Sequence, residues 1–83
     1  MEVDRFSDTA PYIQIAEQLR AAIVAGEITA RLPSARDVAQ DAGVAQFTAL
    51  KALRLVREWG YARVTVGLGA WAVKPEDWPG DGQ

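Results

Sequence analysis

The sequence predicts a mainly α domain of the α+β class, in which three helices precede a two-stranded β-hairpin. Two observations support this. Residues 32–61 hold two apolar-periodic segments separated by a glycine turn, which is the pattern of a helix-turn-helix. After Gly60 the sequence changes to two short β-favouring runs around Gly67 and Gly69, which is typical of a hairpin. Three helices followed by a hairpin is the order of a winged helix-turn-helix domain.

The first predicted helix covers residues 12–25. Pro11 suits the first turn of a helix, and Asp8 or Thr9 lies close enough to cap it. Gly26 ends the helix. At about 100° per residue, one side of this helix is apolar and is expected to face the core. It consists of Tyr12, Ile15, Ala16, Leu19 and Ile23.

The helix-turn-helix is expected to begin at Ser34, with Asp37 at the spacing of a capping box. Its first helix ends at Gly43, which can adopt a left-handed conformation. Its second helix covers residues 45–59. The side of this helix that is expected to face inward consists of Ala45, Ala49, Ala52, Leu53 and Val56. The outward side consists of Gln46, Phe47, Leu50, Lys51, Arg54, Arg57 and Glu58.

The hairpin is expected from two strand-like runs, residues 61–66 and residues 70–73. The glycine-rich turn between them is a hairpin signal. The simplest reading of Tyr61 and Trp71 is that both are core side chains of this hairpin.

The two ends of the chain differ in composition from the domain between them. Residues 1–10 are expected to form an irregular arm in which Val3 and Phe6 can dock on the body. Residues 75–83 are rich in Pro, Gly and acid, and are expected to form an acidic flexible tail. The winged helix-turn-helix domain proper is therefore predicted over residues 11–74.

The composition argues against most enzyme classes. The 83 residues form one small domain with no Cys and no His, so disulfides, Cys/His metal sites and catalysis by Cys or His are excluded. No cofactor and no metal are expected, and no pair of carboxylates suggests acid/base chemistry. No apolar run approaches the roughly 20 residues of a membrane span, and the N-terminus has no signal pattern. A cytoplasmic protein is expected.

The formal net charge of −2 is unevenly distributed along the chain. Residues 1–30 hold two basic and five acidic residues, and residues 75–83 hold three acidic residues and no basic one. Residues 31–74 hold seven basic and three acidic residues, so the positive charge coincides with the helix-turn-helix. This asymmetry indicates a basic face between acidic flanks.

Several stretches of the sequence resemble the DNA-binding domain of the GntR family of bacterial transcription regulators. They are PYIQIAEQLRAAIVAGEI, LPSARDVAQDAGV, the helix end ALRLVREWGY and the Gly-Leu-Gly turn. The resemblance implies a winged helix-turn-helix that binds operator DNA, usually as a homodimer on a palindromic site. Family members normally add a C-terminal domain that binds a metabolite. Because the sequence ends before such a domain, a stand-alone regulator without a small-molecule effector is expected.

The resemblance also implies site residues. The family's DNA contacts carry over directly at Arg36, Thr48, Gly67 and Gly69. Elsewhere the sequence departs from the family, which usually has Ser or Thr, then Arg, then Thr or Asn after the Gly-Val turn. The residues that depart from the family's usual ones are Ala45, Gln46, Phe47, Leu50, Leu68 and Ala70. Leu68, between the two glycines, remains a candidate contact of the wing.

Side-chain chemistry supplies a role for each polar candidate. Gln46 can bond adenine bidentately. Lys51, Arg54 and Arg57 lie along the outward side of the helix, where phosphate binding needs only charge and reach. Arg36 lies in the first turn of its helix, where the macrodipole disfavours a cation, and a phosphate or guanine would offset this. The alternative for each of these residues is an ordinary solvated side chain, and for Thr48 a packing role.

Phe47 and Leu50 form an exposed apolar pair on the predicted reading helix. They can meet thymine methyl groups, bind a partner protein or pack on the wing, and the DNA groove ranks first. The sequence therefore predicts a DNA-binding transcription regulator, a repressor, with helix 45–59 in the major groove and wing 61–73 on the flanking groove. Two alternatives stay open: a winged-helix module that binds proteins, and a DNA-binding accessory factor in recombination or plasmid maintenance.

Overall fold

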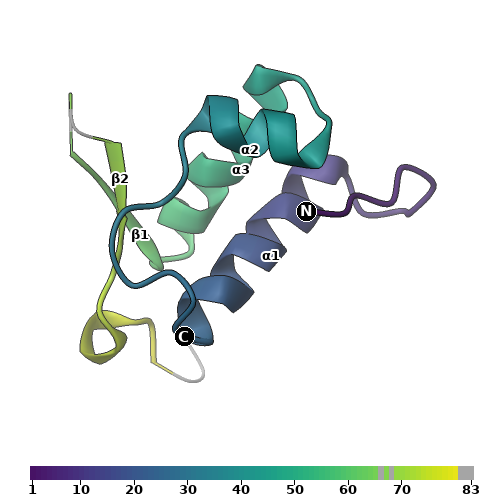
Figure 1. Ribbon diagram of the computed structural model, residues 1–83. Helices are drawn as coiled ribbons and strands as arrows, with labels where there is room; N and C mark the ends of the chain where they lie inside the picture. The colour runs from purple at the N-terminus through teal and green to yellow at the C-terminus, as the bar shows by residue number, and fades with distance from the viewer. Residues whose placement is uncertain (66, 68, 81–83) are drawn as a thin grey trace.

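The computed structural model describes residues 1–65, 67 and 69–80, and it consists of three helices followed by an antiparallel hairpin (Figure 1). The helices are α1 (Pro11–Val24), α2 (Ala35–Ala42) and α3 (Gln46–Glu58), and the strands are β1 (Ala62–Thr65) and β2 (Gly69–Ala72). A short 3-10 helix, η1 (Pro75–Asp77), follows. The winged helix-turn-helix predicted from the sequence is confirmed.

The helices end at the glycines that the sequence indicates. After α2, Gly43 adopts the left-handed conformation with φ 69°, and the N–H of Val44 donates to the carbonyl of Ala39 at 3.0 Å. The N–H of Gly43 donates to the same carbonyl, so both residues that follow the helix are bonded to its last turn. Glycine tolerates the positive φ that this turn requires. Gly26 and Gly60 follow α1 and α3 in the same left-handed conformation.

The helix starts agree with the sequence at α2 but not at α1. The backbone N–H of Asp37 donates to the hydroxyl of Ser34 at 3.1 Å, so the predicted N-cap of α2 is confirmed. At α1 the N-cap position falls on Ala10, whose side chain accepts no hydrogen bond. Because Asp8 and Thr9 precede that position, the prediction that one of them caps α1 is wrong.

The core is built around α3, because α1 and α2 both pack against it. The inner face of α3 is made of small residues: Ala49, Ala52 and Val56 are fully buried. Ala45 was expected on this face but is exposed, because it is the N-cap residue and precedes the helix. The buried core consists of Ile15, Ala16, Leu19, Ile23, Leu32, Val38, Ala39, Ala49, Ala52, Val56 and Ala62.

The hairpin is anchored to the segment that leads into α2. β1 pairs with β2, and β2 is also bonded along its other edge to residues 30–32. The N–H of Leu32 donates to the carbonyl of Ala70 at 2.9 Å, and the N–H of Ala72 donates to the carbonyl of Ala30 at 2.7 Å. These bonds fix the position of the hairpin beside α3.

Trp71 lies on the outer face of the hairpin, so its predicted core role is wrong. It is 36% exposed and faces Arg63 across the strands. The neighbouring pair, Ala62 and Ala72, points toward the body, and Ala62 is buried. Since side chains alternate between the faces of a strand, small alanines inside place Trp71 outside.

The N-terminal arm lies across the helix-turn-helix. The Arg5 guanidinium donates to the carbonyl of Gly43, and Val3 packs against the core, as predicted. Phe6 does not dock, because its side chain is 99% exposed. The N–H of Phe6 donates to the carboxylate of Asp4 at 3.0 Å, within a turn that directs the ring into solvent. The arm and the hairpin lie at opposite ends of the molecule (Figure 1).

The segment after β2 packs back against the hairpin. The indole N–H of Trp78 donates to the carbonyl of Val73 at 2.8 Å, and its ring centroid lies 5.8 Å from that of Tyr61. Tyr61 and Trp78 are both half-buried. Residues 75–80, the described part of the predicted tail, therefore hold specific contacts, and residues 81–83 lie outside the described residues.

Candidate nucleic-acid interface

The outer face of α3 carries most of the candidate contact residues. The side chains that the helical geometry places outward are exposed as predicted: Gln46, Phe47, Leu50, Lys51, Arg54, Arg57 and Glu58. Phe47 is 66% exposed and Leu50 36% exposed, although both are large and apolar. Thr48 is half-buried at the edge of the inner face. The outer face of α3 is therefore mainly basic and apolar, with one carboxylate, Glu58, at its C-terminal end.

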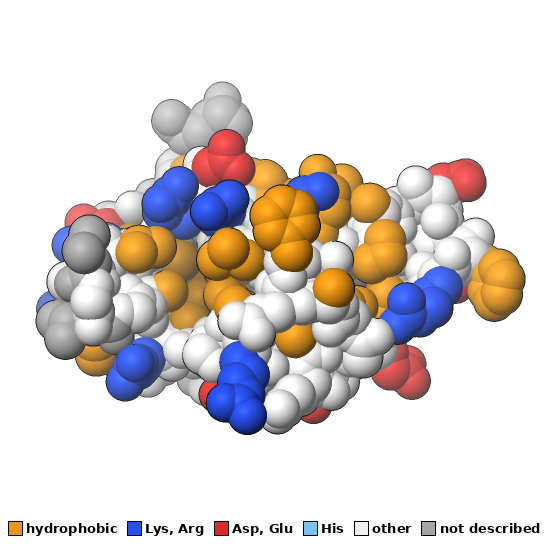
Figure 2. Space-filling view, turned by 90° about the horizontal axis from the view of Figure 1, so that it is seen from above, with side chains coloured by type: hydrophobic (Ala, Val, Ile, Leu, Met, Phe, Trp, Pro, Cys, Tyr) orange, Lys and Arg blue, Asp and Glu red, His pale blue; other side chains and the backbone are white. Residues whose placement is uncertain are grey.

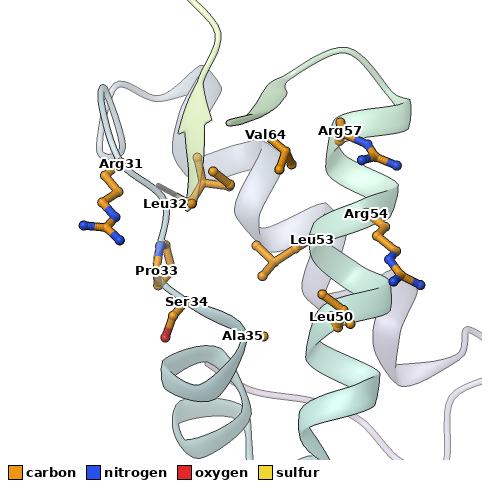
Figure 3. A pocket seen from close by; sticks show the side chains of 12 residues that line it. Arg31, Leu32, Pro33, Ser34, Ala35, Leu50, Leu53, Arg54, Arg57 and Val64 are labelled. Atoms are coloured by element: carbon orange, nitrogen blue, oxygen red, sulfur yellow. The ribbon is translucent and has the colours of Figure 1, made fainter. Parts of the chain in front are cut away.

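A groove of about 420 Å³ lies between α3, the hairpin and the segment that leads into α2. Leu32, Leu53 and Val64 point into the space between these elements, and Arg31 and Arg54 lie on opposite rims (Figure 3). The groove is therefore apolar at its centre and cationic at its edges. Its lining comprises Arg31, Leu32, Pro33, Ser34, Ala35, Leu50, Leu53, Arg54, Arg57, Val64, Gly69 and Ala70.

Arg31 is a residue of this surface that the sequence reading did not identify. Its guanidinium carbon lies 6.0 Å from the centroid of the Trp71 ring. It also lies over Gly69, where a Cβ atom would come within 3.3 Å of the Arg31 guanidinium. Gly69 thus leaves room for the Arg31 guanidinium. No local pattern signals this, because residues 30–32 meet β2 only in the folded chain.

Lys51 links the outer face of α3 to the first turn of α1. Its ammonium nitrogen lies 4.2 Å from the ring centroid of Tyr12 and 6.0 Å from that of Phe47. A cation over an aromatic face is attracted by the ring quadrupole. The Tyr12 and Phe47 rings therefore stabilise the Lys51 ammonium in a position beside the outer face of α3.

The structure does not gather every predicted contact into one place. Leu50, Arg54 and Arg57 share the groove with Gly69, and Phe47 lies beside Lys51. Among the described residues, the groove lining does not include Arg36, Gln46, Thr48 or Gly67. Arg36 is exposed on the first turn of α2, and Gly67 is exposed at the hairpin turn. Leu68 lies outside the described residues.

The cations of this surface have no carboxylate partners within the described part of the chain. There, the single ion pair joins the N-terminal ammonium to Asp41 at 3.0 Å. No Asp or Glu is among the described residues that line the groove. Figure 2 shows Lys and Arg side chains next to hydrophobic ones across one face of the molecule. The surface is therefore suited to a polyanion that also presents apolar groups.

Two further kinds of feature are absent from the described residues. Over residues 1–65, 67 and 69–80, no group of three or more His, Cys, Asp or Glu is placed so that it could hold a metal ion. None of the described helices has the length and apolar character needed to cross a membrane.

Comparison with known sequences identifies a relative that matches over most of this chain. No family model matches the chain. The chain is 37% identical over 78 residues to the Rhizobium meliloti protein "Probable rhizopine catabolism regulatory protein MocR". The match covers 90% of this chain and 16% of that protein, so the chain spans a small part of the length of this relative.

Solved structures extend the comparison. YtrA from Sulfolobus acidocaldarius, a GntR-family transcription factor, is 34% identical with a TM-score of 0.74, and the match covers 87% of this chain and 77% of YtrA. A GntR family transcriptional regulator from Listeria monocytogenes is 26% identical with a TM-score of 0.73, covering 86% and 65% of the two chains. A transcriptional antiterminator from the same species is 22% identical with a TM-score of 0.82, and the match covers 93% of this chain and 59% of that protein. At this identity the likeness shows the fold alone.

Proposed function

This chain belongs to the GntR family of transcription regulators, and we propose that it binds double-stranded DNA in the cytoplasm as a sequence-specific regulator. The observation that supports this best is the outer face of α3. It is the second helix of a helix-turn-helix, and its exposed cations have no carboxylate partner among the described residues. Such a helix is the element that enters the major groove in proteins of this architecture.

The dimensions of α3 suit this role. Its 13 residues make a rod about 20 Å long, and the major groove is about 12 Å wide and admits an α-helix. The N-terminal residues of a recognition helix contact base edges, and here these are Gln46 and Phe47. Lys51, Arg54 and Arg57, further along the helix, then contact phosphates.

The groove between α3 and the hairpin gives a place for one DNA strand. With α3 in the major groove and the hairpin on the flanking groove, a single sugar-phosphate backbone passes between them. Arg31 and Arg54 on the two rims then approach its phosphates, and the apolar side chains between them meet the deoxyribose carbons. Arg36, at the N-terminus of α2, contacts a further phosphate, aided by the positive end of that helix.

We further propose that the protein binds as a homodimer on a palindromic operator and represses transcription by occupying it. Half-sites one helical turn apart, at about 34 Å, would place two copies on one side of the duplex. Selection of duplexes from a random pool tests this directly. Recovery of an inverted repeat supports the dimer, and recovery of a single unrepeated motif contradicts it.

Substitution of Arg36 tests whether α2 contributes a phosphate contact to the proposed interface. Arg36→Ala should weaken binding of the selected duplex by removing a phosphate contact, as measured by fluorescence anisotropy near physiological salt. Lys74→Ala is the matched control, because this exposed cation follows β2 and is not among the residues that line the groove. Equal affinity of Arg36→Ala and the wild type for every duplex would remove Arg36 from the interface. Binding of a partner that does not weaken as salt rises would favour the protein-interaction alternative.

A further inference from the structure

We propose that the first turn of α3 selects A·T base pairs, with Gln46 bonding adenine and Phe47 packing against the 5-methyl group of thymine. This inference rests on the proposed function, because it places α3 in the major groove. It goes beyond that function by naming the base pair that the helix reads and the residues that read it.

Phe47 has the geometry of a reading residue and not of a core residue. It lies in the first turn of α3, it is 66% exposed, and it is absent from the described apolar side chains that pack around the core. Leu50, three residues further on, is also exposed. Large apolar side chains that share one exposed face are stabilised when a partner removes them from water.

The surrounding charge favours DNA over a protein as that partner. Lys51 stands beside the Phe47 ring, and Arg54 and Arg57 continue along the same helix without carboxylate partners in the described residues. An apolar protein surface would bury these cations without neutralising them, which is unfavourable. DNA supplies phosphates for the cations, and in its major groove the exposed apolar group is the thymine methyl.

The chemistry of the Gln46 side chain also favours an A·T base pair. Its amide has both a donor and an acceptor, which match the N7 acceptor and N6 donor that adenine presents in the major groove. Residues 45–48 hold no Arg or Lys, the side chains that most often bond guanine, and no Asp or Glu to accept from cytosine N4. The first turn of α3 therefore matches adenine and thymine and lacks the usual partners of guanine and cytosine.

The spacing of the apolar pair adds a prediction about the half-site. Side chains three positions apart on a helix are about 5–6 Å apart. That distance corresponds to roughly one or two base-pair steps of about 3.4 Å. Phe47 and Leu50 together therefore fit two thymines that lie within two steps of each other.

Removal of single methyl groups from the DNA is the test. Each thymine of the selected duplex is replaced in turn by deoxyuridine, which keeps the base pair and lacks only the methyl, and affinity is measured by fluorescence anisotropy. The wild-type protein should lose roughly threefold to tenfold at the thymine that Phe47 contacts. At that position, Phe47→Ala should bind the thymine and deoxyuridine duplexes equally. Phe6→Ala, which removes a ring that is 99% exposed on the arm, should discriminate as the wild type does.

The outcomes separate this inference from the proposed function. A protein that binds no duplex in a salt-dependent way contradicts the proposed function. A protein that binds its selected duplex but tolerates every deoxyuridine within twofold contradicts the thymine readout alone. A Phe47→Ala variant that still distinguishes thymine from deoxyuridine as the wild type does also contradicts the thymine readout. If Phe47→Ala no longer distinguishes thymine from deoxyuridine and Phe6→Ala still does, the thymine readout by Phe47 is supported.

Discussion

The two faces of α3 have opposite compositions and opposite tasks. The inner face is small and apolar, and Ala49, Ala52 and Val56 are fully buried against the other helices. The outer face carries large side chains that do not pack in the described core, including Phe47, which is 66% exposed. One helix thus contributes to stability with one side and offers a contact surface with the other. Substitutions on the two faces should therefore affect different measurements.

The largest expected effect is on the core that the inner face completes. Leu19, on α1, is 1% exposed, and α1 packs against α3. Leu19→Ala should lower the free energy of unfolding by about 2–5 kcal/mol, because it removes buried surface and leaves a cavity. Urea unfolding followed by tryptophan fluorescence measures this. Val24→Ala is the matched control on the same helix, because Val24 is 51% exposed and should change stability little.

Overpacking of the inner face should have a smaller effect. Ala52 is fully buried. Ala52→Leu should destabilise the domain by about 1–3 kcal/mol, since the added carbons must displace packed neighbours. Ala21→Leu, at an exposed position of α1, adds the same atoms where there is room. Equal unfolding midpoints for the two variants would show that the inner face is not tightly packed.

Loss of the N-cap of α2 should have the next largest effect on stability. Ser34→Ala removes the hydroxyl that accepts from the N–H of Asp37, and it should lower the free energy of unfolding by about 1 kcal/mol. Ser34→Asp keeps an acceptor at the cap and should retain most of that stability. If the Ala and Asp variants unfold at the same urea concentration, the cap does not stabilise α2.

The smallest stability effect is expected on the outer face. Phe47→Ala should change the free energy of unfolding by no more than about 0.5 kcal/mol, because the ring packs on no core residue among those described. The same variant should bind its selected duplex more weakly. A loss of stability comparable to that of Leu19→Ala would show that Phe47 belongs to the fold and not to the interface.

Much of the fold was predictable because its signals are local. The Ser34 cap, the glycines that end the helices and the apolar side of α1 are each set by residues within one or two turns. The outward side of α3 follows from the same periodicity, and its side chains are exposed as predicted. The motifs that resemble the GntR family lie largely in these same segments of the sequence.

The features that the sequence did not reveal depend on contacts between distant segments. Strand alternation shows that Trp71 and Ala72 face opposite sides, but not which of them faces the core, and Trp71 proved to be outside. Arg31 reaches the groove only because residues 30–32 pair with β2. The docking of Trp78 likewise needs the carbonyl of Val73 and the Tyr61 ring in place.

The salt dependence of duplex binding by the wild type and by Arg54→Ala tests the central claim most directly. Arg54 is exposed on the outer face of α3 and lines the groove. If it contacts a phosphate, the slope of log K against log salt should become shallower by about 0.9 in Arg54→Ala, while the free energy of unfolding stays unchanged. Parallel slopes and equal affinities for the two proteins would contradict the assignment of this face to DNA.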